Sequence, residues 1–579
     1  MLRTHTCGEL RKADVGKQVQ LAGWLNKLRT FGSLTFIDIR DRYGITQVVV
    51  DPKIDISKLK PEFVIQVKGK VVERKDKNKE LPTGDIEITA QELNILNTCD
   101  TLPMSISEEI ASTEETRLKY RYLDLRKPAV QNYFAVRHKA AMAAREYLSS
   151  QDFMELETPM LVKSTPEGAR DYVVPSRVNP GKFYALPQSP QLYKQILMVA
   201  GFDRYFQLPR CLRDEDLRQD RQPEHTQIDL EMSYVSEVQD IWRIVEGLFR
   251  HIFKKAIGYD LKTPFPVISW KDSMDQYGID KPDIRYDMRI FDVSDIVRDC
   301  GFGVFKDTVN KGGVVKGLKA EGCGDYSRKD IDRLTELTKV HHAKGLVTLK
   351  VKDGRLDGSA AKFLDERIQK DLIRTAGAKD GDLLLFIADE WQTACTVLGQ
   401  LRIHLGKELK LFDPSDFKFC WISDFPLFEW NKDEKKWDPA HHMFCMPKEE
   451  HIKMLETDPG KVFCTQYDVA LNGVELGSGS IRINRPDIQE KVMKVIGMSE
   501  EEAQMKFGFL LNAFRYGAPP HGGIGIGFDR VVALMCRLED IREVILFPKN
   551  KSAQCPMDDS PSVIDRKQLD ELNIDVRKR

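Results

Sequence analysis

The densest cluster of residues that could bind a charged ligand lies at residues 210–231. Arginines and acids alternate closely there, and mixed charge of this kind usually marks a salt-bridged hairpin on the protein surface. Residues 226–231, however, alternate between polar and apolar types, which predicts a strand with one polar face. A polar-faced strand within a large domain indicates a binding site for an anionic ligand.

A second cluster lies at residues 467–482, where Asp468 and Glu475 precede a stretch rich in glycine and serine. Two carboxylates can hold Mg²⁺ through oxygen ligands, especially when phosphates complete the coordination. Glycines let a ligand approach the backbone closely. The alternative is a turn that carries two surface acids.

A third cluster ends at Asp529 and Arg530, where an apolar helix is predicted to begin. An arginine at a helix start favours phosphate binding. The preceding glycines at residues 523–527 do not form a dinucleotide-binding fingerprint, and alone they are more typical of a tight turn. The sequence also lacks a Walker-type phosphate loop, so ATP would have to be held in another way.

The elements that position these clusters differ along the chain. Residues 1–100 contain five short β-rich runs, which predict a small barrel, most simply the five-stranded oligonucleotide-binding (OB) type. Helical spacing follows at residues 117–125 and 130–150, and a strand is predicted to end at Pro159. Residues 281–415 change to glycine-rich turns and short alternating segments, which indicates a separate α+β insertion.

Composition excludes several classes of protein. The 579 residues have a net charge of −1, so the chain is no basic nucleic-acid coat, although residues 1–100 carry a local excess of +3 (17 Lys and Arg against 14 Asp and Glu). No apolar run is long enough to span a membrane, and the N-terminus has no signal-peptide centre. Eleven cysteines without a CxxC pair predict a reduced, cytoplasmic protein.

The three clusters, in this order, resemble the three motifs of class II aminoacyl-tRNA synthetases. Residues 164–172, 185–195 and 202–205 further resemble the bacterial type of aspartyl-tRNA synthetase. The resemblance runs from Arg3 essentially to the C-terminus, so no cleaved targeting segment is expected ahead of it.

The resemblance implies an α+β multidomain fold. An OB-type anticodon-binding barrel would occupy residues 1–105, followed by a hinge at 106–130. The class II catalytic domain, an antiparallel sheet with flanking helices, would occupy 131–280 and 416–555, with a C-terminal extension at 556–579. The bacterial insertion domain would lie at 281–415. The helix from Val130 and the strand ending at Pro159 resemble motif 1, which builds a homodimer interface in this family.

The resemblance also assigns roles residue by residue. Arg213 and Arg530 would be the catalytic arginines on the phosphates of ATP. The ATP site would comprise Arg213, Asp214, Glu215, Gln222, Glu475, Gly527, Phe528, Asp529 and Arg530. The L-aspartate pocket would comprise Glu167, Gln191, Lys194, Arg213, Asp229, His441 and Arg482. Asp468 and Glu475 would bind Mg²⁺, and Arg29, Phe36 and Gln47 would contact the tRNA anticodon.

The implied reaction suits these residue types. The aspartate α-carboxylate attacks the α-phosphate of ATP and pyrophosphate leaves, so the nucleophile needs no protein base. Catalysis then depends on in-line positioning and on cations that neutralise developing charge. Arg482 can bind the substrate's side-chain carboxylate in a bidentate manner and Lys194 adds a point charge, so asparagine, a neutral amide, would be rejected.

Several positions depart from the family pattern, but none removes a charged catalytic group. Leu212 and His225 stand where phenylalanine is usual, Met443 where proline is usual, Ser478 in place of glycine, and Phe528 in place of leucine. Three other functions stay open: a non-enzymatic tRNA-binding paralogue, an asparagine synthetase on the same fold, and an asparaginyl-tRNA synthetase. The intact motifs argue against a non-enzymatic paralogue. The barrel argues against an asparagine synthetase, and the insertion argues against an asparaginyl-tRNA synthetase.

The choice of tRNA is a further open point. Some enzymes of this type charge tRNA-Asp alone, and others also load aspartate onto tRNA-Asn. Residues 28–32 form the barrel loop where the family makes this choice. A histidine near position 31 accompanies relaxed choice, so Phe31 favours charging of tRNA-Asp alone.

Overall fold

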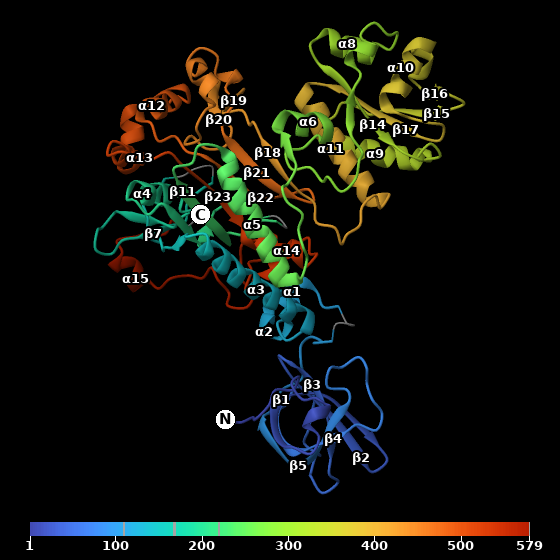
Figure 1. The fold of residues 1–579 in the computed structure, drawn as a ribbon, viewed down its shortest axis with the longest axis vertical. Coiled ribbons are helices and arrows are strands. Elements are labelled where there is room, and N and C mark those ends of the chain that lie inside the picture. The colour runs from blue at the N-terminus through green and yellow to red at the C-terminus, as the bar shows by residue number, and fades with distance from the viewer. Residues whose placement is uncertain (108–110, 166–168, 218–219, 578–579) are drawn as a thin grey trace. The chain divides into compact units, whose positions relative to one another are not determined.

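A computed structural model describes residues 1–107, 111–165, 169–217 and 220–577. Its internal contacts divide the chain into two units. The first consists of Met1–Ala135 with Arg542–Ser562, and the second of Val136–Ile541 with Val563–Arg579. Figure 1 shows the strands of the first unit in blue.

The first unit contains a closed barrel of five strands in the order β1-β2-β3-β5-β4, which confirms the predicted barrel. Its strands are β1 (Gln18–Phe31), β2 (Leu34–Asp41), β3 (Gly44–Val50), β4 (Val64–Glu73) and β5 (Ile86–Asn97). Ile37, Ile39 and Val48 pack in the barrel core. The residues that alternate with them on β2 and β3 therefore lie on the outer face.

Strand β1 is longer than the sequence predicts. A loop was expected at residues 28–32, but Leu28–Phe31 pair in register with residues 34–37 of β2. Only Gly32 and Ser33 remain as the turn, and Gly32 adopts a φ of +60° that suits glycine. A bulge between Leu25 and Lys27 shifts the register. Because a bulge interrupts the alternation of inward and outward residues, the second half of the strand has no clear polar–apolar alternation in its sequence.

The second unit is built around a large sheet with the order β12-β18-β21-β22-β23-β11-β9-β6, to which β10 adds beside β11. Its strands are β6 (Met154–Glu155), β9 (Arg204–Gln207), β10 (Arg210–Leu212), β11 (Glu224–Ser233), β12 (Val267–Ser269), β18 (Phe419–Ser423), β21 (Gln466–Leu471), β22 (Val474–Ile481) and β23 (His521–Gly527). All neighbouring pairs are antiparallel except β12 with β18 and β6 with β9. The sheet agrees with the expected class II architecture, although β6 is much shorter than the strand predicted to end at Pro159.

The two faces of this sheet differ in chemistry. Helix α5 (Val238–Ile257) covers one face, where Trp242 stacks on Trp421 with ring centres 5.0 Å apart (Figure 1). Ile228 and Leu230 of β11 are fully buried. Because side chains alternate along a strand, Asp229 and Glu231 lie on the opposite face. The expected polar-faced strand is thereby confirmed.

The glycine run at residues 523–527 is a central strand, and the prediction of a tight turn is wrong. A Cβ atom at Gly523 would lie 2.2 Å from Oε2 of Glu231, and one at Gly525 would lie 3.2 Å from Oδ2 of Asp229. Asp229 pairs with Gly525 and Glu231 with Gly523 across the two strands. The glycines of β23 therefore leave the space that the acids of β11 fill.

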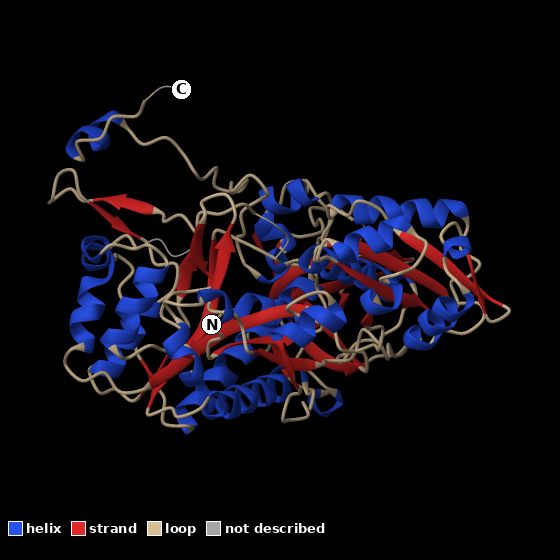
Figure 2. Ribbon diagram, turned by 90° about the horizontal axis from the view of Figure 1, so that it is seen from above, coloured by secondary structure: helices blue, strands red, loops and turns tan. Residues whose placement is uncertain are grey.

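The segment between β12 and β18 forms a second sheet with the order β13-β14-β17-β15-β16. Its strands are β13 (Ile290–Asp292), β14 (Val314–Ala320), β15 (Val347–Lys352), β16 (Arg355–Asp357) and β17 (Leu383–Asp389). Leu383 and Leu385 pack toward helices α9 (Arg328–Val340) and α11 (Trp391–Glu408). Leu384 and Phe386 pack on the other face, toward α8 (Gly303–Asn310) and α10 (Glu366–Ala376). Helices thus lie on both sides of these strands, as Figure 2 shows.

Further α-helices and short strands complete the described part of the chain. They are α1 (Glu114–Lys119), α2 (Arg121–Asp124), α3 (Pro128–Ser150), β7 (Val173–Pro175), β8 (Phe183–Ala185), α4 (Gln191–Val199), α6 (Trp270–Tyr277), α7 (Ser294–Val297), β19 (Phe428–Asn431), β20 (Lys436–Pro439), α12 (Pro486–Val495), α13 (Glu500–Phe514), α14 (Phe528–Met535) and α15 (Arg566–Glu571). Across the described part of the chain, no helix has both the length and the apolar character needed to cross a membrane.

Candidate active site

A cavity of about 440 Å³ is lined by the polar face of the large sheet and by helices α4 and α14. It brings together most of the residues that the resemblance assigned to ATP and aspartate. Those that line it are Gln191, Lys194, Arg213, Glu215, Gln222, Asp229, Glu475, Arg482, Gly527, Asp529 and Arg530.

Four assigned residues with described positions are not among those that line the cavity. Glu167 lies outside the described residues. Asp214 pairs with Arg170 at 3.7 Å, and Phe528 is buried, with the guanidinium of Arg137 over its ring. His441 is exposed and packs edge-on against Phe425. Asp468 lies one strand behind the lining, paired with Ser478 across β21 and β22.

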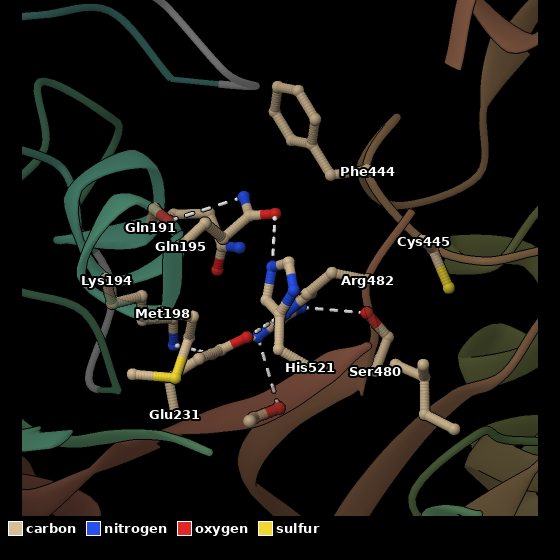
Figure 3. A network of polar contacts seen from close by, with 12 residues as sticks. Gln191, Lys194, Gln195, Met198, Glu231, Phe444, Cys445, Ser480, Arg482 and His521 are labelled. Atoms are coloured by element: carbon tan, nitrogen blue, oxygen red, sulfur yellow. Dashed lines mark hydrogen bonds and ion pairs between the residues drawn. The ribbon is translucent and has the colours of Figure 1, made fainter. Parts of the chain in front are cut away.

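One end of the cavity holds a buried arginine. Arg482 is 2% exposed, and its guanidinium donates to both carboxylate oxygens of Glu231 at 2.9 and 3.2 Å. It also donates to Oγ of Ser480 at 2.8 Å and to the carbonyl of Gly523 at 3.1 Å. Figure 3 shows Glu231 and Ser480 on either side of this guanidinium. Burial alone would raise the pKa of Glu231, but Arg482 and Lys194 lower it, so the carboxylate stays ionised.

Lys194 from α4 adds a second buried cation. Its Nζ lies 3.1 Å from Oδ2 of Asp229 and 3.2 Å from Oε2 of Glu231. The sequence places these two acids on one face of β11, and the structure brings Lys194 and Arg482 to them. Burial raises the pKa of Asp229 to about 6, with Glu231 adding to the rise and Lys194 opposing it. The four groups form an ordered site that can accept an anionic ligand.

His442, and not the predicted His441, lines this end of the cavity. Its Nδ1 accepts a hydrogen bond from the backbone N–H of Phe444 at 3.2 Å, which leaves the proton of a neutral ring on Nε2. That Nε2 lies 3.1 Å from Nη1 of Arg482. Burial and the charge of Arg482 hold the pKa of His442 well below its usual value, so the ring stays neutral. Two donors therefore face each other, an arrangement that a bound carboxylate would relieve.

Three buried polar atoms beside this pocket have no hydrogen-bond partner within the described ranges. They are Oε1 of Gln227, Oδ1 of Asp229 and Nε2 of Gln191, and all three residues line the cavity. Buried polar atoms are normally satisfied, so unpaired ones in a cavity wall indicate a ligand. Two acceptors and one donor suit the ammonium and carboxylate groups of an amino acid.

The other end of the cavity carries Arg213 and Arg530. Arg530 donates to the carbonyl of Glu475 at 2.9 Å and lies 3.3 Å from Oδ2 of Asp220. These two contacts hold its guanidinium in place. His225 lines the same cavity, and its pKa is lowered to about 3, by burial first and then by the charges of Arg213 and Arg530. A neutral ring near two cations suits a nucleotide base with its phosphates.

The residues of β21 and β22 fit a divalent cation. Asp468 is buried, and burial together with the nearby charge of Glu475 raises its pKa well above the usual value. Its Oδ1 has no hydrogen-bond partner among the residues with described positions. Within the described part of the chain, no group of three or more potential ligand residues is present. Two carboxylates alone suit Mg²⁺ that is shared with substrate phosphates, so the chemistry of this donor set fits.

The outer face of the barrel gathers the residues assigned to tRNA. Arg29 pairs with Asp38 at 2.8 Å and donates to Gln47 at 3.4 Å, while Gln47 donates to Glu87 at 2.7 Å. Phe36 lies directly opposite Arg29 across β1 and β2. The ring of Phe31, 68% exposed, meets that of Phe36 edge-on at 6.3 Å. Two aromatic rings beside polar, hydrogen-bonding side chains can stack single-stranded bases.

Sequence reasoning missed several residues of the site. Glu231 could have been found, because it lies two residues after Asp229 on the same strand face. Gln227 follows from the same periodicity. Ser480, His442 and Ser189 have no such signal, since only the fold brings their strands and loops to the cavity.

Comparison with known proteins gives the same picture. The family described as tRNA synthetases class II (D, K and N) matches residues 113–551, and the OB-fold nucleic acid binding domain matches residues 19–96.

Among characterised relatives, an aspartate–tRNA(Asp/Asn) ligase of Treponema denticola is 52% identical over the whole of both chains. An aspartate–tRNA ligase of Ruminiclostridium cellulolyticum is 49% identical over 100% of this chain and 98% of its own.

Solved structures share the fold at low identity. Asparaginyl-tRNA synthetase from Pyrococcus horikoshii, complexed with asparaginyl-adenylate, aligns with a TM-score of 0.59 at 21% identity, over 95% of this chain and 98% of that one. Aspartyl-tRNA synthetase from Entamoeba histolytica aligns with a TM-score of 0.57 at 19% identity, over 95% and 92%.

Proposed function

The chain belongs to the class II tRNA synthetases (D, K and N), and we propose that it is an aspartate–tRNA ligase. It would activate L-aspartate with ATP to give aspartyl-adenylate and pyrophosphate, and then transfer aspartate to the 3′ end of tRNA-Asp. The observation that carries this proposal is the cavity, which holds a buried cation pocket at one end and two arginines with Glu475 at the other.

The cation pocket supports aspartate as the amino acid. Arg482 and Lys194 are fixed by Glu231 and Asp229, so their charges stay in place whether or not a ligand is bound. A substrate carboxylate would accept from Nη1 of Arg482 and from Nε2 of His442. An amide would leave one donor facing another, and such mismatches reduce kcat/KM by several powers of ten. Asparagine synthetase and asparaginyl-tRNA synthetase activities are therefore the less favoured readings.

The other end supports phosphoryl chemistry. The aspartate α-carboxylate is ionised at neutral pH and can attack the α-phosphate without a protein base. Arg213 would neutralise charge on the α-phosphate and Arg530 on the leaving phosphates, which lowers the barrier because both are held in place before reaction. Asp468 and Glu475 would hold Mg²⁺, which when bound would help to neutralise the charge of the phosphates.

The barrel supports recognition of the tRNA anticodon. Phe36 would stack on a base, while Arg29 and Gln47 would hydrogen-bond base edges or phosphates. The alternative to a tRNA-Asp-specific enzyme is a non-discriminating one that also aspartylates tRNA-Asn, and relatives bear both kinds of name. Phe31 at the exposed end of β1 favours discrimination.

Three further parts of the proposal concern organisation. The domain boundaries expected from the sequence would hold, with the insertion at 281–415 as a domain of its own. Helix α3 and the exposed residues Met142 and Met154 would form a homodimer interface. The protein would act in the cytoplasm.

The deciding experiment is charging of purified tRNA-Asp and tRNA-Asn with labelled aspartate, together with ATP–pyrophosphate exchange on aspartate and asparagine. We expect exchange with aspartate only and charging of tRNA-Asp only. Comparable charging of both tRNAs would establish the non-discriminating alternative. Exchange with asparagine, or with neither amino acid, would overturn the proposal.

A further inference from the structure

A single arginine of α3 joins two elements that flank the nucleotide end of the cavity. Nη1 of Arg137 donates to Oδ1 of Asp529 in α14 at 2.5 Å, and its Nη2 donates to Oγ1 of Thr226 in β11 at 3.0 Å. Its guanidinium also lies over the ring of Phe528, 4.9 Å from the centroid. Arg137 does not itself line the cavity, whereas Thr226 and Asp529 do.

The charge of Asp529 explains why this contact matters. Asp529 is 3% exposed and lies in the first turn of α14, directly before Arg530. Its Oδ2 accepts the backbone N–H of Thr226 at 2.8 Å, so both oxygens are used. Without Arg137 this carboxylate would remain buried in a wall that is proposed to face phosphates, and an uncompensated buried charge is strongly unfavourable.

The contact between Arg137 and Asp529 also fixes the position of the first turn of α14 relative to β11. Asp529 links the start of α14 to Thr226 of β11. Arg137 of α3 donates a hydrogen bond to each of these two residues. Arg530 follows Asp529 on the helix and reaches Glu475 and Asp220, so a shift of the first turn would move its guanidinium. The aspartate end is held separately, through Glu231 and Lys194.

We propose that Arg137 is a positioning residue for ATP: it neutralises and orients Asp529, and thereby places Arg530 and strand β11 around the nucleotide. The proposal deepens the function proposed above and rests on it. Its consequence is selective, because loss of Arg137 should weaken the nucleotide site and leave the aspartate pocket intact.

The test compares steady-state ATP–pyrophosphate exchange and ligand-induced thermal stabilisation in the full-length protein. For R137M we expect KM for ATP to rise on the order of tenfold or more, while KM for aspartate stays within about twofold. R137K, which keeps the charge, should recover part of the loss. R137M/D529N should be less impaired toward ATP than R137M, because no unpaired carboxylate remains.

The matched control is R243M, on helix α5. Arg243 pairs with Asp240 at 2.6 Å, and its side chain is 72% exposed. R243M should behave as wild type. Equal increases in both KM values for R137M, or a double variant as impaired as R137M, would overturn the proposal.

Two further measurements distinguish an incorrect role for Arg137 from a variant that does not fold and from an incorrect proposed function. If R137M does not fold, R137K alone must show the selective rise in KM for ATP, and its absence overturns the proposal. If the wild type exchanges with neither amino acid, the proposed function fails, but the thermal shift produced by ATP still tests Arg137. A full ATP shift in R137M would contradict its role.

Discussion

At the scale of single residues, Arg482 is defined by its partners as much as by its charge. Its guanidinium is held by Glu231, 251 positions away in sequence, and by Ser480. For Arg482→Leu we expect aspartate-dependent pyrophosphate exchange to fall about a thousandfold or more, because the substrate carboxylate loses its bidentate partner. Exchange kinetics with purified protein measure this.

The structure changes how that variant must be controlled. Leucine at position 482 leaves Glu231 buried with Lys194 as its remaining cation, so a loss of activity could reflect unfolding. The double variant Arg482→Leu/Glu231→Gln removes the unpaired charge and should be equally inactive with a normal melting temperature. Arg485→Leu, at an arginine that is 51% exposed and pairs with Asp487, should remain active. An active double variant would refute the assignment of Arg482.

The raised pKa of Asp229 predicts a pH dependence of aspartate use. Below a pH of about 6 the folded enzyme protonates this carboxyl, so it loses the charge that holds Lys194 and can attract the substrate's ammonium group. Free aspartate does not titrate between pH 5 and 8. With ATP saturating, kcat/KM for aspartate should therefore fall as pH decreases through about 6. Asp229→Asn should lower kcat/KM for aspartate and remove its decrease at low pH. If the decrease at low pH is unchanged in this variant, it belongs to the titration of another group.

At the scale of elements, the sequence predicted types of element better than their partners. The period-2 alternation of β11 identified a polar face, and helical spacing identified α3. The glycines of β23 were misread, because glycine reports only that a backbone is crowded or unusual, and here the crowding comes from β11 across the sheet. His442 and Ser480 were missed for the same reason, since the contacts that define them join segments far apart in sequence.

The glycine strand gives a direct test of this packing. At Gly523 an added Cβ would lie 2.1 Å from a backbone oxygen and 2.2 Å from Glu231, whereas at Gly525 the nearest atom lies at 3.2 Å. Gly523→Ala should lower the melting temperature by about 5 °C or more and weaken aspartate use, because β11 must move. Gly525→Ala should do less. Gly345→Ala, with nothing within 4 Å, is the control, and equal stability of all three variants would contradict the packing.

At the scale of the whole molecule, the two halves of the proposed reaction use different units. Every residue that lines the cavity belongs to the second unit, and the aromatic pair and polar cluster of the barrel belong to the first. Activation of aspartate should therefore be insensitive to the outer face of the barrel, while transfer to tRNA should depend on it. A single barrel substitution can separate the two steps.

Phe36→Ala provides that separation. Loss of a stacked base typically weakens binding about tenfold or more, so KM for tRNA-Asp should rise by that factor. Pyrophosphate exchange without tRNA should stay at the wild-type rate, which also shows that the variant is folded. Tyr43→Ala removes another exposed aromatic, at the opposite end of β2 from Phe31, and should leave both measurements unchanged. Normal charging by Phe36→Ala would mean that the aromatic pair does not contact tRNA, whereas a parallel loss of exchange would mean that the barrel supports the activation site itself.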